Sequence, residues 1–302
     1  MISARLGVAS ILGGSTFFAT IGTAQAIAGL DASPLSLGAA RLIVASVALV
    51  ILLPAFGQQR RGLIRMWRGR PMIIAALATA CFQVSFFAGV RQAGVALGTL
   101  IVIGSVPIFT GLLSWAFLRQ RPTLGWLAAT AVCLVGLALL FSQGMAAGSP
   151  LGVVLCLFTG LGIATYAVAA RTMLDTGMHP VRLMAGTFSL GAVIMLPIIA
   201  LQPLGWLTQP HGIALALYLG LATMVLANWL QLQGLKVIGP APTMTLNLAE
   251  PMIAAVLGVV VLGERLSPLG VAGLVLVMAG LTLQSALLAR QESHQPLAAT
   301  AA

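Results

Sequence analysis

Hydrophobic residues run along this chain in long stretches, and polar residues fall mainly in the short gaps between them. A bilayer core about 30 Å thick takes roughly 20 apolar helical residues to cross, so each stretch of that length predicts a membrane span. The pattern predicts ten transmembrane helices, which lie at Leu6–Ala28, Leu35–Pro54, Pro71–Val90, Val95–Leu118, Leu124–Phe141, Leu151–Ala170, Leu183–Leu201, Gly212–Leu235, Ala241–Leu262 and Leu269–Leu288.

Composition excludes the other common classes of protein. The 302 residues are 60% hydrophobic and 7% charged, whereas soluble domains carry about 25% charged residues. A disordered chain needs low hydrophobicity, and three cysteines are too few for a disulfide scaffold. The net charge of +10 comes from basic residues set between apolar runs, so we expect no nucleic-acid partner. The fold class is therefore all-α integral membrane.

The basic residues also predict the orientation, because cytoplasmic loops carry an excess of Lys and Arg. With the N-terminus in the cytoplasm, three basic residues fall on the opposite, extracytoplasmic side, namely Arg41, Arg91 and Arg265. The cytoplasmic side then holds Arg5, Arg60, Arg61, Arg65, Arg68, Arg70, Arg119, Arg121, Arg171, Arg182, Lys236 and Arg290. This bias requires an even number of spans and places both termini in the cytoplasm.

The chain also matches itself at a nearly constant offset. A shift of 145 residues places Leu6-Gly7 on Leu151-Gly152 and Leu124-Gly125 on Leu269-Gly270. A shift of 144 places Pro107 on Pro251. Each half holds five spans, an odd number, so the second half must be inverted in the membrane. We expect one five-helix repeat over residues 1–145, an inverted five-helix repeat over 146–289, and a disordered cytoplasmic tail over 290–302. The triplet Ala24-Gln25-Ala26 fits a signal-peptidase site, but the repeat requires the first span.

Several motifs resemble the drug/metabolite transporter superfamily and its EamA family. The most specific are Leu248-Ala249-Glu250-Pro251 and Leu262-Gly263-Glu264-Arg265-Leu266-Ser267. Their first-half counterparts are Ser105-Val106-Pro107 and Leu118-Arg119-Gln120-Arg121-Pro122, while Gly13-Gly14-Ser15-Thr16-Phe17 resembles the first-helix motif. The resemblance implies a ten-helix metabolite exporter in the bacterial inner membrane, and the amino-acid-exporting branch of the YddG type is the most similar.

Glu250 is the strongest candidate for a functional residue, because an ionisable side chain near the middle of a span is costly. It lies about ten residues into its span, roughly 15 Å deep. It would bind a substrate ammonium or accept a proton in antiport. The structural alternative is a Glu that satisfies carbonyls freed by Pro251.

Two amides, Gln83 and Asn228, are related by the 145-residue shift. We expect them to line a central cavity, because inverted-repeat transporters bind substrate near the midplane. The alternative is a hydrogen bond between packed helices. Gln231 and Gln233 lie nearer the cytoplasmic end and are expected to meet lipid headgroups.

Weaker candidates complete the cavity. The resemblance places the helices of Thr20, Thr99 and Asn247 around the central site, and Tyr166 would stack on an apolar substrate or fill space between helices. Arg41 is expected to snorkel toward the membrane surface, with pairing to Asp31 or a position guarding the outer mouth as alternatives. The paired prolines Pro107 and Pro251 are expected to be hinges for alternating access.

The sequence carries no recognisable enzyme motif. His179, His211 and His294 fall outside the spans, and no GxxxxGK[ST] loop for ATP occurs. We therefore expect no catalytic residue, no metal site and no cofactor. The expected partners are a small-molecule substrate and the lipid bilayer, in a monomer or homodimer.

These observations predict a secondary transporter that exports small amphipathic metabolites, mainly neutral or aromatic amino acids. With no charge pair expected at depth, the cavity should be mostly apolar with a few amides and hydroxyls. A drug or lipophilic-cation/proton antiporter is the main alternative, and an intramembrane enzyme is the alternative from another class.

Overall fold

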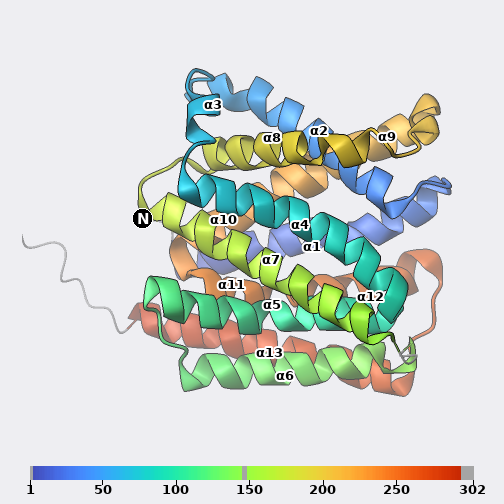
Figure 1. The fold of residues 1–302 in the computed structure, drawn as a ribbon. Helices are drawn as coiled ribbons and strands as arrows, with labels where there is room; N and C mark the ends of the chain where they lie inside the picture. Colours follow the sequence, from blue (N-terminus) through green and yellow to red (C-terminus); the bar gives the residue numbers. More distant parts are fainter. Residues whose placement is uncertain (1–2, 145–147, 294–302) are drawn as a thin grey trace, which may run out of the picture.

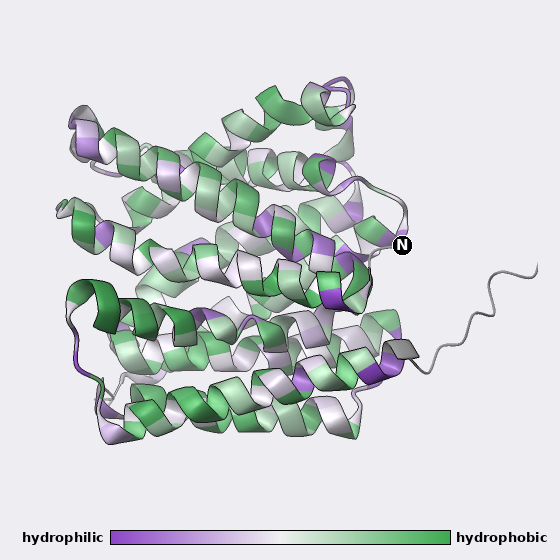
Figure 2. Ribbon diagram, turned by 180° about the vertical axis from the view of Figure 1, so that it is seen from behind, coloured by the Kyte–Doolittle hydropathy of each residue, from purple (hydrophilic) through white to green (hydrophobic). Residues whose placement is uncertain are grey.

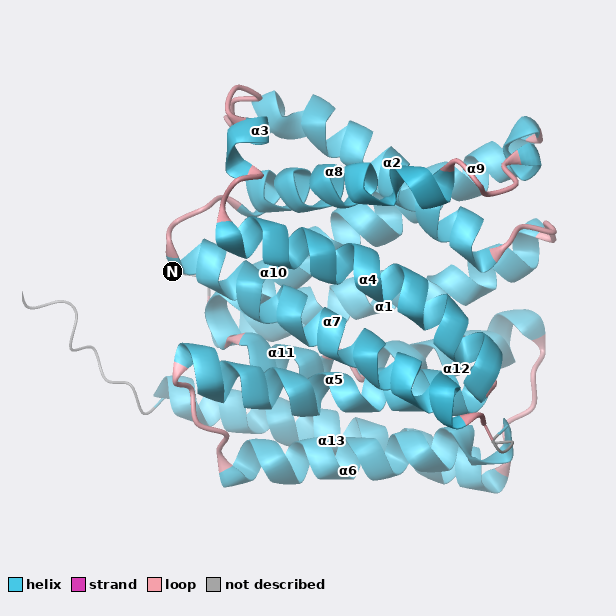
Figure 3. Cartoon of the chain, viewed as in Figure 1, coloured by secondary structure: helices cyan, strands magenta, loops and turns pink. Residues whose placement is uncertain are grey.

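The computed structural model describes residues 3–144 and 148–293. Within these ranges the chain is helical and contains no strand (Figure 3). Ten helical segments are long and apolar enough to cross a membrane. Each corresponds to one predicted span, so the prediction of an all-α protein with ten membrane helices is confirmed.

The first five spans are single helices apart from one short turn at the end of the second. They are α1 (Ala4–Ala28), α2 (Pro34–Leu52) followed by the 3₁₀ turn η1 (Leu53–Phe56), α4 (Arg70–Ala93), α5 (Val95–Leu118) and α6 (Leu124–Phe141). The linker after α2 contains the one-turn helix α3 (Leu63–Met66), and the 3₁₀ turn η2 (Ser142–Gly144) follows α6.

Two of the last five spans are interrupted. The sixth and seventh are α7 (Pro150–Asp175) and α8 (Pro180–Ile199), which the 3₁₀ turn η3 (Gly205–Thr208) follows. The eighth comprises α9 (Pro210–Tyr218), a π-helical segment η4 (Leu219–Leu226) and α10 (Ala227–Ile238). The ninth comprises α11 (Pro240–Leu246) and α12 (Ala249–Leu262). The tenth, α13 (Pro268–Ser293), continues into the first residues of the predicted tail, whose remainder, 294–302, lies outside the described residues.

Local sequence explains where the helices begin. Ser33 and Ser149 are N-caps whose hydroxyls accept hydrogen bonds from the backbone N–H three residues later, at 3.1 and 3.0 Å. Each is followed by a proline, whose fixed φ suits the first helical position and whose missing N–H costs nothing there. The serine–proline pairs therefore set the starts of α2 and α7.

The helices lie side by side in one bundle (Figure 1). One edge is formed by α6 and α13, the fifth and tenth spans, which pack on each other; α2 and α8 pack together toward the opposite edge. Between these edges, α1 packs on α10 and α12, while α4 and α5 pack on α7. The N-terminus and the end of α13 lie at the same end of the bundle.

Glycines let the edge helices α6 and α13 approach closely. A Cβ at Gly136 would lie 2.7 Å from the carbonyl oxygen of Gly273, and one at Gly280 would lie 2.9 Å from the carbonyl oxygen of Ala129. Both distances are shorter than van der Waals contact. Small residues at helix contacts are typical of membrane proteins, where packing rather than water exclusion holds helices together.

Large apolar side chains cover the outside of the bundle. Phe117 is 74% exposed and Val260 is 76% exposed. Hydrophobic residues predominate along the helices, while hydrophilic residues gather mainly toward the helix ends and in the loops (Figure 2). A soluble protein rarely exposes so much apolar surface, and lipid is the solvent that this surface suits.

Candidate functional site

The ninth span breaks where the chain carries its most polar intramembrane segment. Pro251 has no N–H to donate to the carbonyl of Asn247, four residues earlier. That carbonyl instead accepts a hydrogen bond from the Glu250 N–H at 2.9 Å, and the Leu248 N–H bonds the Thr245 carbonyl at 3.1 Å. These tighter bonds end α11 and restart the helix as α12, with Glu250 in its first turn.

Asn247, at this break, is tied to the first span. Ser15 of α1 donates from Oγ to Asn247 Oδ1 at 3.3 Å. Gln231 of α10 donates from Nε2 to the Ile11 carbonyl at 3.3 Å and to Ser15 Oγ at 3.5 Å. A polar chain therefore links α10, α1 and the broken ninth span.

The expectation that Gln231 meets lipid headgroups is therefore wrong. Its side chain is only 7% exposed, and it faces α1 inside the bundle. Gly14 makes this approach possible, since a Cβ there would lie 2.9 Å from the Ala227 carbonyl and 3.1 Å from the Gln231 side chain. A glycine in the first span, which permits close helix packing, is the sequence signal that could have pointed to a buried polar contact here.

Gln83 holds the second polar group. It is 2% exposed and donates from Nε2 to the Gly38 carbonyl of α2 at 3.3 Å. Its Oε1 accepts a hydrogen bond from Arg41 Nη2 at 3.3 Å. Gln83 therefore connects α4 to α2 and orients a cation in the interior.

The prediction that Arg41 snorkels to the surface is consequently wrong. Its guanidinium turns to Gln83, and its Nε is buried without a hydrogen-bond partner. No ion pair joins it to Asp31 in the described ranges. Glu250 is the group whose negative charge acts on Arg41.

Glu250 is partly exposed, and within residues 3–144 and 148–293 its carboxylate makes no hydrogen bond or ion pair at bonding distance. Arg41 on α2 is the cation whose charge acts on this carboxyl group. The expectation of an interior without opposite charges did not include Arg41, whose guanidinium bonds Gln83 inside the bundle. Arg41 and Glu250 therefore carry opposite charges on separate helices and form no salt bridge.

Asn228, expected to resemble Gln83, makes a different set of contacts. Its Nδ2 donates to the Met224 carbonyl at 2.9 Å and approaches the Thr223 carbonyl at 3.5 Å, both on its own span. These carbonyls belong to the π-helical segment, where the wider turn leaves backbone groups without their usual partners. Asn228 satisfies that segment, rather than bonding a neighbouring helix.

The remaining candidates are spread over several helices. Thr20 Oγ1 donates to the Phe17 carbonyl at 2.6 Å and lies 2.7 Å from the hydroxyl of Tyr218, which links α1 to α9. The hydroxyl of Tyr166 is buried without a partner, and its ring packs on the apolar core of α2, α4, α7 and α8. Thr99 lies partly buried near the start of α5. Tyr166 and Thr99 share no hydrogen bond with the other candidates.

The two candidate hinges also differ. Pro251 stands directly after the break in the ninth span, whereas Pro107 lies inside the continuous helix α5. Among the described residues, no group of three or more His, Cys, Asp or Glu side chains is arranged to hold a metal ion.

Comparison with known proteins gives a consistent result. The chain is 35% identical to the uncharacterized transporter YwfM of Bacillus subtilis over 92% of its own length and 93% of that protein. It is 30% identical to a probable terminal-alkyne amino-acid exporter of Streptantibioticus cattleyicolor, over 82% of each chain. A crystal structure of another protein superposes with a TM-score of 0.79 at 19% identity, covering 95% of this chain and all of that one, which shows a shared fold.

The names of the two relatives describe transporters, and ten apolar helices make this chain a multi-pass membrane protein. The model of the EamA-like transporter family matches it twice, over residues 5–142 and 150–286. Together the two matches cover nearly all of the ten spans, and the chain belongs to the EamA-like transporter family.

Proposed function

We propose that this transporter exports small zwitterionic metabolites, above all neutral and aromatic amino acids. The observation that carries the proposal is that two ionisable side chains of opposite charge lie at depth without a salt bridge: Arg41 on α2, which bonds Gln83 inside the bundle, and the partly buried Glu250 on α12. An amino acid has the complementary arrangement, with a carboxylate for Arg41 and an ammonium for Glu250. Charge-assisted hydrogen bonds of this kind are about twice as strong as neutral ones.

The interior also holds apolar side chains that suit a substrate with an apolar part. Val106, Ala167 and Met244 form a buried apolar cluster between α5, α7 and α11. Gln83 fixes the position of the Arg41 guanidinium, so that little side-chain freedom is lost on binding. The amino-acid exporter among the relatives supports the same substrate class.

We further infer that the two halves are inverted repeats, and contacts at equivalent positions support this. A Cβ at Gly7 of α1 would lie 3.1 Å from Ile238 of α10, at the end of the bundle that carries the N-terminus. Exactly 145 positions later, a Cβ at Gly152 of α7 would lie 2.5 Å from the backbone nitrogen of Ala93 of α4. Equivalent helices therefore meet at equivalent glycines, as a two-fold relation requires.

The edge helices support the same relation. Gly136 approaches Gly273 and Gly280 approaches Ala129, and a shift of 144 residues turns the first pair into the second. The double match to the family model agrees with two repeats. Alternating access would then rock one half against the other, with Pro251 and Pro107 as hinges, both termini in the cytoplasm, and the bacterial inner membrane as the location.

Counterflow in proteoliposomes tests the substrate. Labelled phenylalanine should exchange in a saturable way without a pH gradient. Arg41→Gln and Glu250→Gln should each reduce the exchange by about tenfold or more, because each removes a charge-assisted contact of about 1.5–3 kcal/mol. Arg41→Lys should retain part of it. Asp31→Asn and Arg121→Gln are matched controls, since they remove the same charges from exposed loop positions.

Substrate analogues separate the two charges. Phenethylamine lacks the carboxylate and phenylpropionate lacks the ammonium, so neither should compete well with phenylalanine. If no amino acid exchanges, and a lipophilic cation instead moves under a proton gradient, the amino-acid proposal is overturned. Cation antiport predicts that Glu250→Gln abolishes this flux and that Arg41→Gln does not, because Arg41 repels a cation.

A further inference from the structure

A polar pocket lies at the end of the bundle that carries the N-terminus, away from Arg41 and Glu250. Its volume is about 550 Å³, and its polar lining includes Gln58, His179, Arg182 and Lys236. A second pocket of about 260 Å³ shares Met66, Thr176 and Met178 with the first and adds Arg65. The linker after α2, the start of α8 and the end of α10 therefore meet around one basic hollow.

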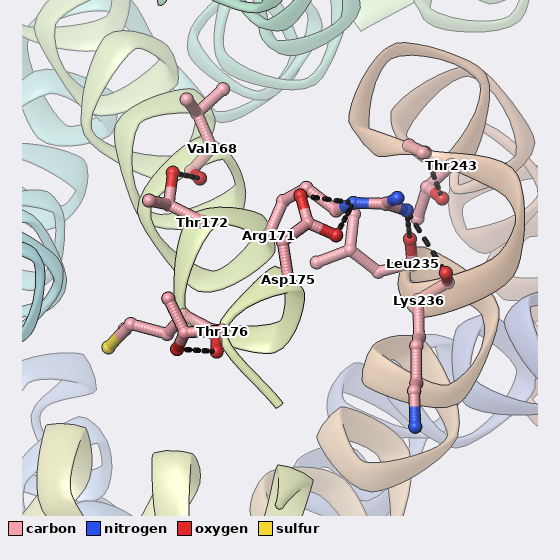
Figure 4. Close-up of polar contacts among 10 residues, drawn as sticks. Val168, Arg171, Thr172, Asp175, Thr176, Leu235, Lys236 and Thr243 are labelled. Atoms are coloured by element: carbon pink, nitrogen blue, oxygen red, sulfur yellow. Dashed lines mark hydrogen bonds and ion pairs between the residues drawn. The ribbon is translucent and has the colours of Figure 1, made fainter. Parts of the chain in front are cut away.

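The nearest described acid does not neutralise this hollow. Asp175 is occupied by Arg171, whose Nε lies 2.9 Å from Oδ1 and 3.1 Å from Oδ2. The same guanidinium donates from Nη1 to the carbonyls of Leu235 and Lys236 at 2.8 and 3.1 Å. Figure 4 shows Arg171 between the Asp175 carboxylate and these carbonyls, with the Lys236 ammonium pointing away from the carboxylate.

The two cations of the pocket therefore have no carboxylate partner among the described residues. Among the described residues, the hydrogen bond of Arg182 goes to the thioether of Met66, with 2.9 Å between Nε and Sδ, and a thioether is a weak acceptor that carries no charge. Lys236 is exposed, and no carboxylate lines either pocket.

Further donors complete the site. His179 is the N-cap of α8, and its Nδ1 accepts a hydrogen bond from the Val181 N–H. In the neutral ring the hydrogen must then be on Nε2, which makes that atom a donor. The first turn of α8, a 20-residue helix, adds the positive end of the helix dipole. Donors and positive charge thus surround a hollow without an acidic residue.

We propose that this pocket binds a phosphate ester, supplied by the headgroup of an anionic phospholipid. Phosphate offers several acceptor oxygens for Arg, Lys and helix N-terminal groups. Basic pockets between membrane helices are suited to such headgroups. The pocket lies at the bundle end, where headgroups meet the protein, and a bound phosphate joins the linker, α8 and α10. A soluble phosphate compound has the same chemistry and is distinguished by experiment.

Binding to the delipidated full-length protein in detergent tests this proposal. The probes are dihexanoyl phosphatidic acid, dihexanoyl phosphatidylcholine of the same chain length, and inorganic phosphate, each measured by isothermal titration calorimetry. We expect the phosphatidic acid to bind and the phosphatidylcholine not to bind. The double variant Arg182→Gln/Lys236→Gln should weaken binding by about tenfold or more, because it removes two charge-assisted contacts.

The double variant Arg5→Gln/Arg121→Gln is the matched control, since it removes the same charge from exposed positions outside both pockets. Arg182→Lys with wild-type Lys236 keeps the charge and should retain binding, which separates loss of the site from loss of the fold. If inorganic phosphate binds as tightly as phosphatidic acid, the phosphate site stands but the lipid source is refuted. Equal losses in the two double variants, or no binding of either phosphate probe, would overturn the proposal.

Discussion

The fourth and ninth spans share a proline at equivalent positions, yet only one of them breaks. Pro107 lies within the continuous helix α5, whereas Pro251 follows the break between α11 and α12. The difference lies in the neighbours: beside Pro251 stand Asn247 and Glu250, while the residue before Pro107 is Val106. A proline weakens a helix in a membrane, but polar groups and their partners on other helices make a break tolerable.

The third and eighth spans repeat this contrast. α4 is a continuous helix whose Gln83 reaches across to α2, while the eighth span widens into a π-helical segment that Asn228 satisfies. Both irregular spans belong to the second half of the chain. If the halves arose as equal repeats, the second has acquired most of the irregular backbone, and we expect it to contribute more of the conformational change.

Where the halves are equivalent, equal substitutions should have equal and large effects. Gly136→Val and Gly280→Val each push a side chain against the backbone of the facing edge helix, and each should destabilise the protein by about 3 kcal/mol. Gly22→Val is the control, because nothing lies within 4 Å of a Cβ there. The loss of stability is measured as a lower midpoint of thermal unfolding, monitored by size-exclusion chromatography of the heated samples. A large loss of stability at only one of the two positions would contradict the equivalence of the two halves at this contact.

Where the halves differ, equivalent substitutions should differ in their effect on transport. Pro251→Ala restores an N–H that can bond the Asn247 carbonyl and so straightens the ninth span. We expect it to lower the rate of phenylalanine counterflow by about tenfold, or about 1.4 kcal/mol. Pro107→Ala should change this rate less, because α5 is already continuous. Equal rates in the two variants would show that the break has no special part in transport.

The smallest effect is expected at the ends of these two spans. Arg119 ends α5 with φ 57°, and it is the one non-glycine residue with positive φ in the described ranges, while Gly263 holds the equivalent position after α12. Arg119→Gly should therefore stabilise the protein by about 1 kcal/mol, and Gly263→Ala should destabilise it by a similar amount. Thermal unfolding of both variants, with Arg121→Gly as the control for lost charge, checks the signs.

The architecture was accessible from the sequence because it depends on long apolar stretches, which give one strong signal per span. The details of the site were less accessible. Polarity at depth was enough to propose Gln83 and Glu250 as candidates, but the inward turn of Arg41 depends on a hydrogen bond to another helix. No proline in the π-helical segment signals the irregular backbone in the sequence. The contact of Gln231 with Ser15 depends on how two spans that are distant in the sequence pack together.

The glycine contacts between α6 and α13 also constrain how this gene can change. At Gly136 a larger residue meets the opposite backbone first, and at Gly280 it meets the Cys133 side chain but also the opposite backbone, at the Ala129 carbonyl and the Cys133 nitrogen. A second mutation that trims a neighbour therefore cannot rescue the first, as it often can in a side-chain core. Descendants of this chain can alter the interior of the bundle by paired mutations, but along this edge compensation would require the helices to move apart.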